Sequence, residues 1–357
     1  MYKIKQLPED FIVREINDIK FNDSGQYCYF ALKKKNYNTL KAIQKIAEKL
    51  RINEKNIGFA GNKDKNALTQ QVISIYGGNK NIETIKLKDI ELKYIGKGNE
   101  KIYLGNLKSN EFIITIRNLE KNDAEKIKEK LKKGQIFIPN YFGEQRFSNN
   151  NPLIGKAIIK NNFKEAIDLI LKSNSDYNEK IEQHLQKQKN DFVVALKLIP
   201  FRLLKLYIHS YQSFLFNKAL EQYTKSNKNN EKSYNKELIN NEKINNDNLI
   251  NDKKLLINVK IPLIGFATEL GNKKIEKIIK KILEQEQISP RDFIIRQIPD
   301  LSQEGSERNA FINISDFKII NIEKDELNKN KEKITVKFSL PKGSFATVLV
   351  DYLFDET

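Results

Sequence analysis

The sequence contains very little cysteine and histidine. Its one cysteine, Cys28, cannot form an internal disulfide and lies among aromatic residues, so we expect core packing and a reducing compartment. The two histidines, His184 and His209, both fall in helical patterns. With a single cysteine they cannot supply a Cys/His zinc site, whereas a magnesium ion held only by carboxylates stays open.

Long apolar runs are also missing. No stretch approaches the ~18 consecutive apolar residues that indicate a membrane-spanning helix. Near the N-terminus, Lys3 and Lys5 are followed by polar residues and Pro8, which is not a signal-peptide pattern. We therefore expect a soluble, cytoplasmic protein.

Acidic residues are fewer than basic ones. The chain has 63 Lys and Arg against 46 Asp and Glu, giving a net charge of +17. This balance favours a polyanionic partner, although a general bias toward lysine and asparagine is an alternative explanation. The length of 357 residues is enough for two domains with cores of their own.

The first part of the chain has the pattern of a sheet with a few helices. Helices are expected from about residue 38 and from 122 to 134. Alternating or β-branched segments predict strands at 10–16, 27–35, 68–76, 90–96, 101–105 and 110–119, with an extended segment at 135–148. This order is typical of an α+β domain whose helices pack on one antiparallel sheet.

The middle of the chain is predicted to be helical. Helices are expected at 163–172, 178–190, 202–223 and 274–287. Residues 226–252 are rich in asparagine and lysine, so we interpret them as a mobile insertion. Residues 334–354 return to strand character and need partners in the first domain, so the middle is predicted to be an insertion into that domain.

The segment GFAGNKDKNALTQQVISI, from Gly58 to Ile75, places the carboxylate of Asp64 on a polar loop between two expected strands. Lys63 and Lys65 flank it, and their charges would favour the ionised form that a nucleophile or base requires. From these residues alone, an ordinary solvated turn is the favoured interpretation, because charged loop tips are common.

The string AGNKDKNALTQQ resembles the catalytic motif of the TruD family of pseudouridine synthases. Four further segments resemble that family in the same order: LPEDFIVREI, PNYFGEQRFS, YQSFLFN and LPKGSFATVLV. The resemblance implies a pseudouridine synthase core, with a mixed, mainly antiparallel sheet and helices, interrupted by an α-rich TruD-specific domain. The implied borders are 1–150 and 312–357 for the core and 151–311 for the inserted domain.

The resemblance implies an isomerase that acts on transfer RNA, in this family at uridine 13, without a cofactor. Asp64 falls on the catalytic aspartate, which either attacks the ribose C1′ or removes the 2′ proton to give a glycal; the sequence does not choose. The target base must leave the RNA stack, which costs a few kcal/mol. Nothing in the sequence requires a protein partner or more than a monomer.

Phe142 falls where the family places an aromatic ring against the flipped base, and Asn140 where an asparagine fixes the loop or the substrate. Composition alone favours simple packing of Tyr141, Phe142 and Phe147 beneath a turn. Lys5 matches a basic residue near the family's aspartate, with a solvated terminal lysine as the alternative. The other residues expected to bind substrate or line the pocket are Arg146, which suits a phosphate or a carboxylate, Lys63, Gly343, Ser344 and Phe345.

Two other classes of function compete with this one. A non-catalytic RNA-binding or RNA-folding protein on the same scaffold needs only the basic surface and leaves Asp64 idle. A carboxylate-dependent ribonuclease or glycosylase would release fragments or free uracil. A synthase acting at another RNA site is a third possibility, which substrate mapping distinguishes.

Overall fold

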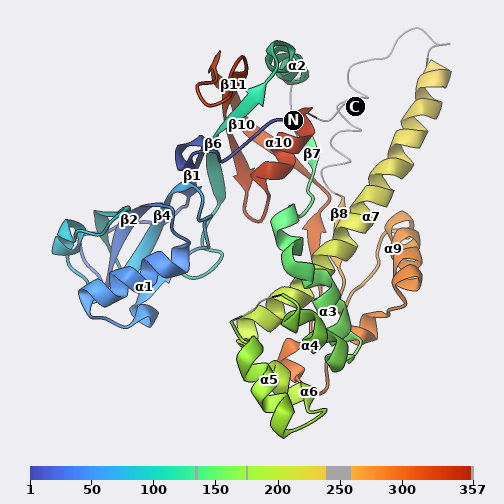
Figure 1. Cartoon of the computed structure of the whole chain (residues 1–357). Helices are drawn as coiled ribbons and strands as arrows, with labels where there is room; N and C mark the ends of the chain where they lie inside the picture. Colours follow the sequence, from blue (N-terminus) through green and yellow to red (C-terminus); the bar gives the residue numbers. More distant parts are fainter. Residues whose placement is uncertain (133–135, 174–175, 239–258, 355–357) are drawn as a thin grey trace. The chain divides into compact units, whose positions relative to one another are not determined.

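The computed structural model describes residues 1–132, 136–173, 176–238 and 259–354. The chain divides into two compact units (Figure 1). The first consists of Met1–Ile138 with Asn313–Thr357, and the second of Pro139–Ile312. The domain borders expected from the sequence, 1–150 with 312–357 and 151–311, stay a prediction.

The first unit is built on one mixed sheet. Its strand order is β5-β2-β4-β1-β6-β11-β10-β7, with β3 beside β4. The β1–β4 pair is parallel, and the pairs β1–β6, β2–β4, β2–β5, β3–β4, β6–β11 and β10–β11 are antiparallel. The expected mixed, mainly antiparallel sheet is confirmed. The strands are β1 (Phe11–Ile16), β2 (Tyr27–Lys35), β3 (Ile57–Phe59), β4 (Leu68–Tyr76), β5 (Ile90–Gly98), β6 (Ser109–Leu119), β7 (Ile136–Pro139), β10 (Phe311–Lys324) and β11 (Glu332–Pro341).

Helix α1 (Thr39–Leu50) covers part of this sheet (Figure 1). It begins at Asn38, whose side chain accepts a hydrogen bond from the amide of Lys41. Its buried residues pack with Cys28 and other apolar side chains of β2 and β4 in one core. Two further helices belong to this unit, α2 (Lys121–Lys132) and α10 (Ala346–Phe354).

A buried charge network fixes the start of β1 to β6. The guanidinium of Arg117 lies 2.8 Å from Asp10 Oδ1 and 3.0 Å from Asp325 Oδ1. All three side chains are at most 4 % exposed. Because these charges are almost fully removed from water, each depends on the others for its partner.

The second unit is mainly helical. Its elements are α3 (Asn151–Ile159), α4 (Phe163–Leu171), α5 (Asn178–Lys187), α6 (Phe192–Lys197), α7 (Phe201–Leu238), α9 (Lys273–Glu286) and the two-stranded sheet of β8 (Lys260–Leu263) and β9 (Ser306–Asn309). The long helix α7 supplies the centre of its core (Figure 1). The helix predicted at 202–223 is confirmed, and its buried stripe consists of residues at most 1 % exposed: Leu204, Ile208, Tyr211, Leu215 and Ala219.

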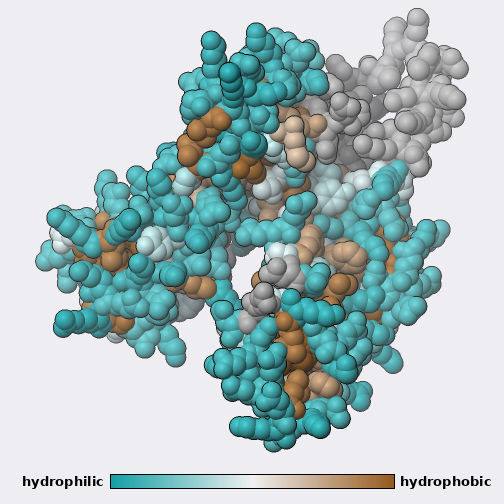
Figure 2. All heavy atoms as spheres, in the orientation of Figure 1, coloured by the Kyte–Doolittle hydropathy of each residue, from teal (hydrophilic) through white to brown (hydrophobic). Residues whose placement is uncertain are grey.

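Helix α7 continues to Leu238, so the first part of the 226–252 segment is helical. The rest of the predicted mobile insertion, from residue 239 on, lies outside the described residues. Hydrophilic side chains predominate on the face shown in Figure 2. Within the described ranges, no helix combines the length and apolarity needed to cross a membrane.

Three local expectations were wrong. Residues 346–354 form α10, because Ala346, Leu349, Val350 and Leu353 recur at helical spacing and are buried together. Residues 101–105 are not a strand, since side chains and a turn satisfy their backbone, as in the bond from Ile102 N to Ser74 Oγ. The segment predicted as extended at 135–148 ends in a 3-10 helix, Glu144–Asn150.

Candidate active site

Asp64 lies on the loop between β3 and β4, as the sequence predicts. The two strands pair antiparallel, with Ile57 opposite Ile75 and Phe59 opposite Ile73. Ala60 and Ala67, near the two ends of the loop, are at most 2 % exposed. The loop is therefore anchored at both sides while Asp64 keeps 34 % of its side chain exposed.

The carboxylate of Asp64 forms an ion pair with Lys5. Lys5 Nζ lies 2.7 Å from Asp64 Oδ2, and also 4.1 Å from the centre of the Phe11 ring. The contact joins positions 59 residues apart in the chain. It fixes the direction of a carboxylate that remains accessible to a substrate.

Within the described residues, neither lysine beside Asp64 forms an ion pair with it. Lys63 Nζ lies 2.7 Å from Glu15 Oε2, and these side chains are 6 % and 0 % exposed. Lys65 is exposed. Lys63 therefore anchors the loop through Glu15, and Asp64 pairs with Lys5. The expected contact of Lys63 with substrate stays a prediction.

Polar side chains from α1 and β4 hold the same loop. Thr39 Oγ1 accepts the amide of Lys63 at 2.9 Å and donates to Gln71 Oε1. Gln71 Nε2 in turn donates to the carbonyl oxygen of Gly61 at 3.1 Å. Thr39 and Gln71 are almost fully buried, so these bonds are protected from competition with water. These hydrogen bonds explain the role of Gln71, the second glutamine of the motif AGNKDKNALTQQ.

Lys34 is a residue that the sequence did not single out. Its ammonium, in a side chain 1 % exposed, donates to the carbonyl oxygens of Tyr37, Lys63 and Asp64 at 2.5, 3.4 and 3.1 Å. Burial lowers the pKa of Lys34 to about 8; the charge of Lys63 also lowers it, while that of Asp64 opposes the shift. In the run KKKN no local signal distinguishes this buried lysine from the exposed Lys33 or the half-buried Lys35.

Replacing Lys34 by methionine should slow the reaction at Asp64 while leaving RNA affinity unchanged. The apolar stem is kept, but the carbonyl oxygens of the loop lose their donor, and misplacement by about 1 Å can cost roughly 10²-fold in rate. Single-turnover rates of the variant and of Lys33→Met, an exposed lysine on the same strand, would measure this. Equal rates in the two variants would contradict the anchoring role.

Asn140, Phe142 and Arg146 lie together in the second unit. Asn140 is 6 % exposed, its amide donates to Ala310 O at 2.8 Å, and its side-chain Nδ2 donates to Asn309 O. The ring of Phe142 packs edge-on against Phe216. Each contact described here lies within this unit, as those of Asp64 lie within the first.

Asn217 and Arg308 are partners in this cluster that the sequence analysis missed. Asn217 Oδ1 accepts the amide of Phe142, and its Nδ2 donates to the carbonyl oxygen of the same residue, both at 2.9 Å. The guanidinium of Arg308 lies 4.1 Å from the centre of the Phe142 ring. Asn217 is the last residue of the YQSFLFN segment of α7. The resemblance of that segment to the family is the signal that could have identified Asn217.

Gly343, Ser344 and Phe345 form the turn after β11 in the first unit. Gly343 has a φ of 80°, a conformation that favours glycine, and Ser344 N donates to Pro341 O at 3.2 Å. Ser344 and Phe345 are half-buried where α10 begins. Their expected contact with substrate stays a prediction.

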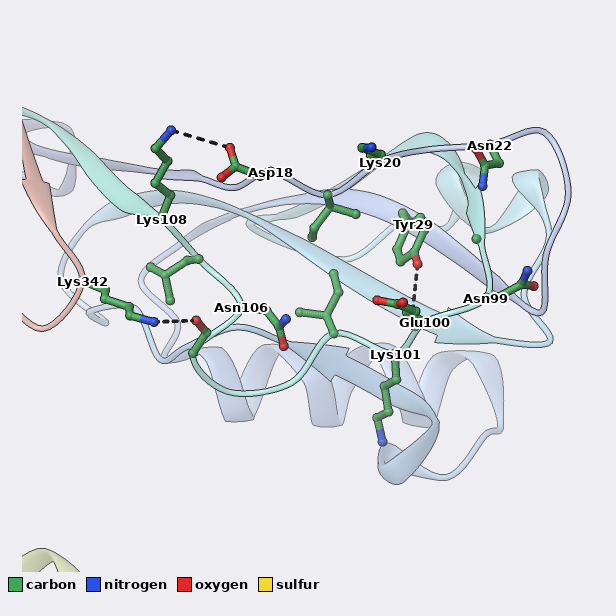
Figure 3. A pocket seen from close by; sticks show the side chains of 15 residues that line it. Asp18, Lys20, Asn22, Tyr29, Asn99, Glu100, Lys101, Asn106, Lys108 and Lys342 are labelled. Carbon is green, nitrogen blue, oxygen red and sulfur yellow. Dashed lines mark hydrogen bonds and ion pairs between the residues drawn. The ribbon is translucent and has the colours of Figure 1, made fainter.

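The neighbouring Lys342 reaches into a pocket of about 750 Å³ in the first unit (Figure 3). The pocket is also lined by three further lysines, Lys20, Lys101 and Lys108, and by two acidic residues, Asp18 and Glu100. One wall is tied to the Asp64 loop, because Gly105 N donates to Ala60 O at 2.7 Å. A lining in which lysines outnumber acids suits an RNA phosphate better than an apolar ligand.

Comparison with known proteins gives a consistent result. The family model described as tRNA pseudouridine synthase D (TruD) matches residues 2–183 and 171–352. The chain is 30 % identical to the "Probable tRNA pseudouridine synthase D" of Methanococcoides burtonii, over 98 % of this chain and 92 % of that protein. It is 33 % identical to the "Probable tRNA pseudouridine synthase D 2" of Methanocaldococcus jannaschii, over 99 % and 91 %.

A solved structure is similar as well. The crystal structure of the Methanosarcina mazei protein assigned as tRNA pseudouridine synthase D (TruD) superposes with a TM-score of 0.72 and 28 % sequence identity. The match covers 98 % of this chain and 92 % of that one. The architecture of the whole chain is therefore shared, beyond the short motifs around Asp64.

Proposed function

Because the chain belongs to the TruD family of tRNA pseudouridine synthases, we propose that it converts uridine to pseudouridine in tRNA with Asp64 as its catalytic residue. The observation that carries the assignment is the geometry of Asp64. It is a partly exposed carboxylate on an anchored loop, paired with Lys5 at 2.7 Å. No other residue of the motif combines accessibility with a fixed acidic group.

The reaction rearranges atoms without adding or removing any. The bond from ribose C1′ to uracil N1 breaks, the base turns, and C5 bonds to C1′ while the C5 proton leaves and a proton is gained at N1. No oxidant or reductant takes part. Asp64 performs either the attack on C1′ or the removal of the 2′ proton, and Lys5 orients the carboxylate for it.

The second unit supplies the proposed contacts for the flipped base. Asn217 holds the backbone of Phe142 on both sides, which leaves the half-buried ring in a fixed position. A base stacked on such a ring gains about 1 to 3 kcal/mol, enough to offset much of the cost of leaving the RNA stack. Asn140 and Arg146 complete this set, and Gly343, Ser344 and Phe345 are proposed to line the pocket in the first unit.

We propose uridine 13 of tRNA as the target position. This position is the one that the family resemblance implies. The basic pocket of Figure 3 supports an RNA contact in the first unit, since its lysines offer phosphate partners. Action in the cytoplasm as a monomer, without an obligate protein partner, is part of the same proposal.

Carbodiimide mapping of unmodified tRNA incubated with the protein tests this target. A primer-extension stop at position 13 is expected, and a stop only at another uridine would overturn the position while keeping the reaction. Intact binding with no stop on any tRNA would instead favour an RNA-binding protein in which Asp64 is idle. Release of free uracil or of RNA fragments would indicate a glycosylase or a nuclease.

A further inference from the structure

Two arginines of the second unit, Arg146 and Arg308, lie beside Phe142. The Cζ atoms of Arg308 and Arg146 are 4.1 Å and 5.8 Å from the centre of the Phe142 ring. Within the described part of the chain, neither forms an ion pair. Arg117, the buried arginine of the first unit, has three acidic partners instead.

The hydrogen-bond donors of the two guanidinium groups are only partly used. Arg308 Nε and Nη2 donate to Asn140 O at 3.2 and 3.1 Å, and Nη2 also donates to Asn140 Oδ1 at 2.7 Å. Arg146 Nε donates to Ser213 Oγ at 3.3 Å. Among the described residues, three donor atoms have no hydrogen-bond acceptor: Nη1 of Arg308 and both Nη atoms of Arg146. The buried side-chain atoms that lack a hydrogen-bond partner belong to other residues, so these three donors are accessible to solvent.

Within the part of the chain that the structure describes, no acidic group pairs with either guanidinium. Burial lowers the pKa of both arginines. For Arg308 the value falls to about 10, through burial first and the charge of Arg146 second. Two half-buried cations that repel each other are costly for the fold unless a ligand of opposite charge binds them.

We propose that Arg146 and Arg308 together bind one backbone phosphate of the RNA, beside the base that stacks on Phe142. Forked guanidinium donors match the oxygen geometry of a phosphate, and a tRNA substrate presents phosphates on both sides of any flipped nucleotide. Arg308 also positions the neighbouring residues, because its guanidinium lies over the Phe142 ring and donates a hydrogen bond to Asn140. The site rests on the proposed function for its ligand, since the RNA is the polyanion that the enzyme binds.

The salt dependence of RNA binding tests the site independently of turnover. Dissociation constants for unmodified tRNA are measured over a range of salt concentrations, in the Asp64→Asn protein so that no product forms. Arg146→Gln and Arg308→Gln should each weaken binding roughly ten- to hundredfold and lower the slope of log K against log salt by about 0.7 to 0.9. If both guanidinium groups are needed to hold the shared phosphate, each single variant already loses that contact. The slope of log K against log salt should therefore fall by about the same amount in the double variant as in either single variant.

Arg296→Gln is the matched control, since Arg296 is an exposed arginine of the same unit that forms no ion pair within the described residues. Three results would each overturn the shared site. The first is an equal loss of affinity and slope in this control, and the second is an unchanged slope in both single variants. The third is a decrease in slope in the double variant that is twice that of a single variant. Arg308→Gln also removes the bonds to Asn140, so circular dichroism must show a native fold. Arg146→Gln, which removes only the bond to Ser213, keeps the test decisive if Arg308→Gln unfolds.

This result can be separated from the proposed function. Isomerisation that survives in Asp64→Asn would overturn the assignment of the catalytic residue, yet the slopes would still report on the phosphate. Conversely, normal slopes in the arginine variants together with an inactive Asp64→Asn protein would remove the phosphate site and leave the enzyme assignment intact.

Discussion

Replacing Asp64 by asparagine is expected to abolish pseudouridine formation while tRNA binding persists. The substitution keeps the size of the side chain but removes the charge that attacks C1′ or accepts the 2′ proton. Loss of a group that takes part directly in proton transfer or bond formation costs on the order of 10² to 10⁴-fold, and here the only candidate carboxylate of the motif is lost. The main-chain bonds that hold the loop remain, because Lys34 donates to the backbone of Asp64.

Carbodiimide mapping and single-turnover release of tritium from C5-labelled tRNA would measure the effect. Asp89→Asn provides a matched control, since Asp89 belongs to the same unit and forms no ion pair within the described residues. Tritium release by Asp64→Asn at the rate of Asp89→Asn would contradict the assignment. Loss of tRNA binding along with activity would point to a structural role for the Lys5 ion pair instead.

Replacing Arg117 by methionine should lower the free energy of unfolding of the first unit by about 3 to 5 kcal/mol. The variant leaves the buried carboxylates of Asp10 and Asp325 without their shared cation. Arg14→Met is the matched control, since Arg14 is 50 % exposed and pairs with Glu111 on the same sheet. Its loss should stay within about 1 kcal/mol. Urea unfolding followed by circular dichroism measures both.

The loss in Arg117→Met should depend on pH. Burial acts to raise the pKa of Asp325, but bonds from the amides of Asn118 and Leu327, from Asn328 and from Arg117 outweigh it and lower the value to about 2. A lowered carboxyl pKa contributes stability above pH 4 that disappears as the pH falls toward 2. The difference between wild type and variant should therefore be largest near pH 7 and shrink below pH 4. A difference that is constant over this range would show that packing, rather than charge, is lost.

The loop that carries Asp64 illustrates what local pattern can provide. Alternation in 68–76 predicted β4 to the residue, and Gly61 with its polar neighbours predicted the turn before it. The proximity of Lys5 followed only from the family resemblance. Lys34 was missed because burial of one lysine in a run depends on strand pairing and on α1, which sequence patterns describe poorly.

The cluster around Phe142 illustrates the opposite case. Asn140 and Phe142 were recognised in a motif, but Arg308 sits in an ordinary polar stretch, 168 residues from Asn140. No local feature distinguishes it from the exposed arginines Arg291 and Arg296. The prediction for 346–354 failed for a related reason, since short β-branched segments fit a strand or a buried helix until their neighbours are known.

The sequence by itself determined the family, the α+β class, the position of most helices and strands, and the catalytic candidate Asp64, because these depend on short-range periodicity and on continuous motifs. Only the tertiary structure decided which charges meet. It paired Lys5 with Asp64 and Lys63 with Glu15, and it left Arg146 and Arg308 beside Phe142. Such pairings join residues far apart in the chain, and their energies depend on burial, which appears only once the chain has folded.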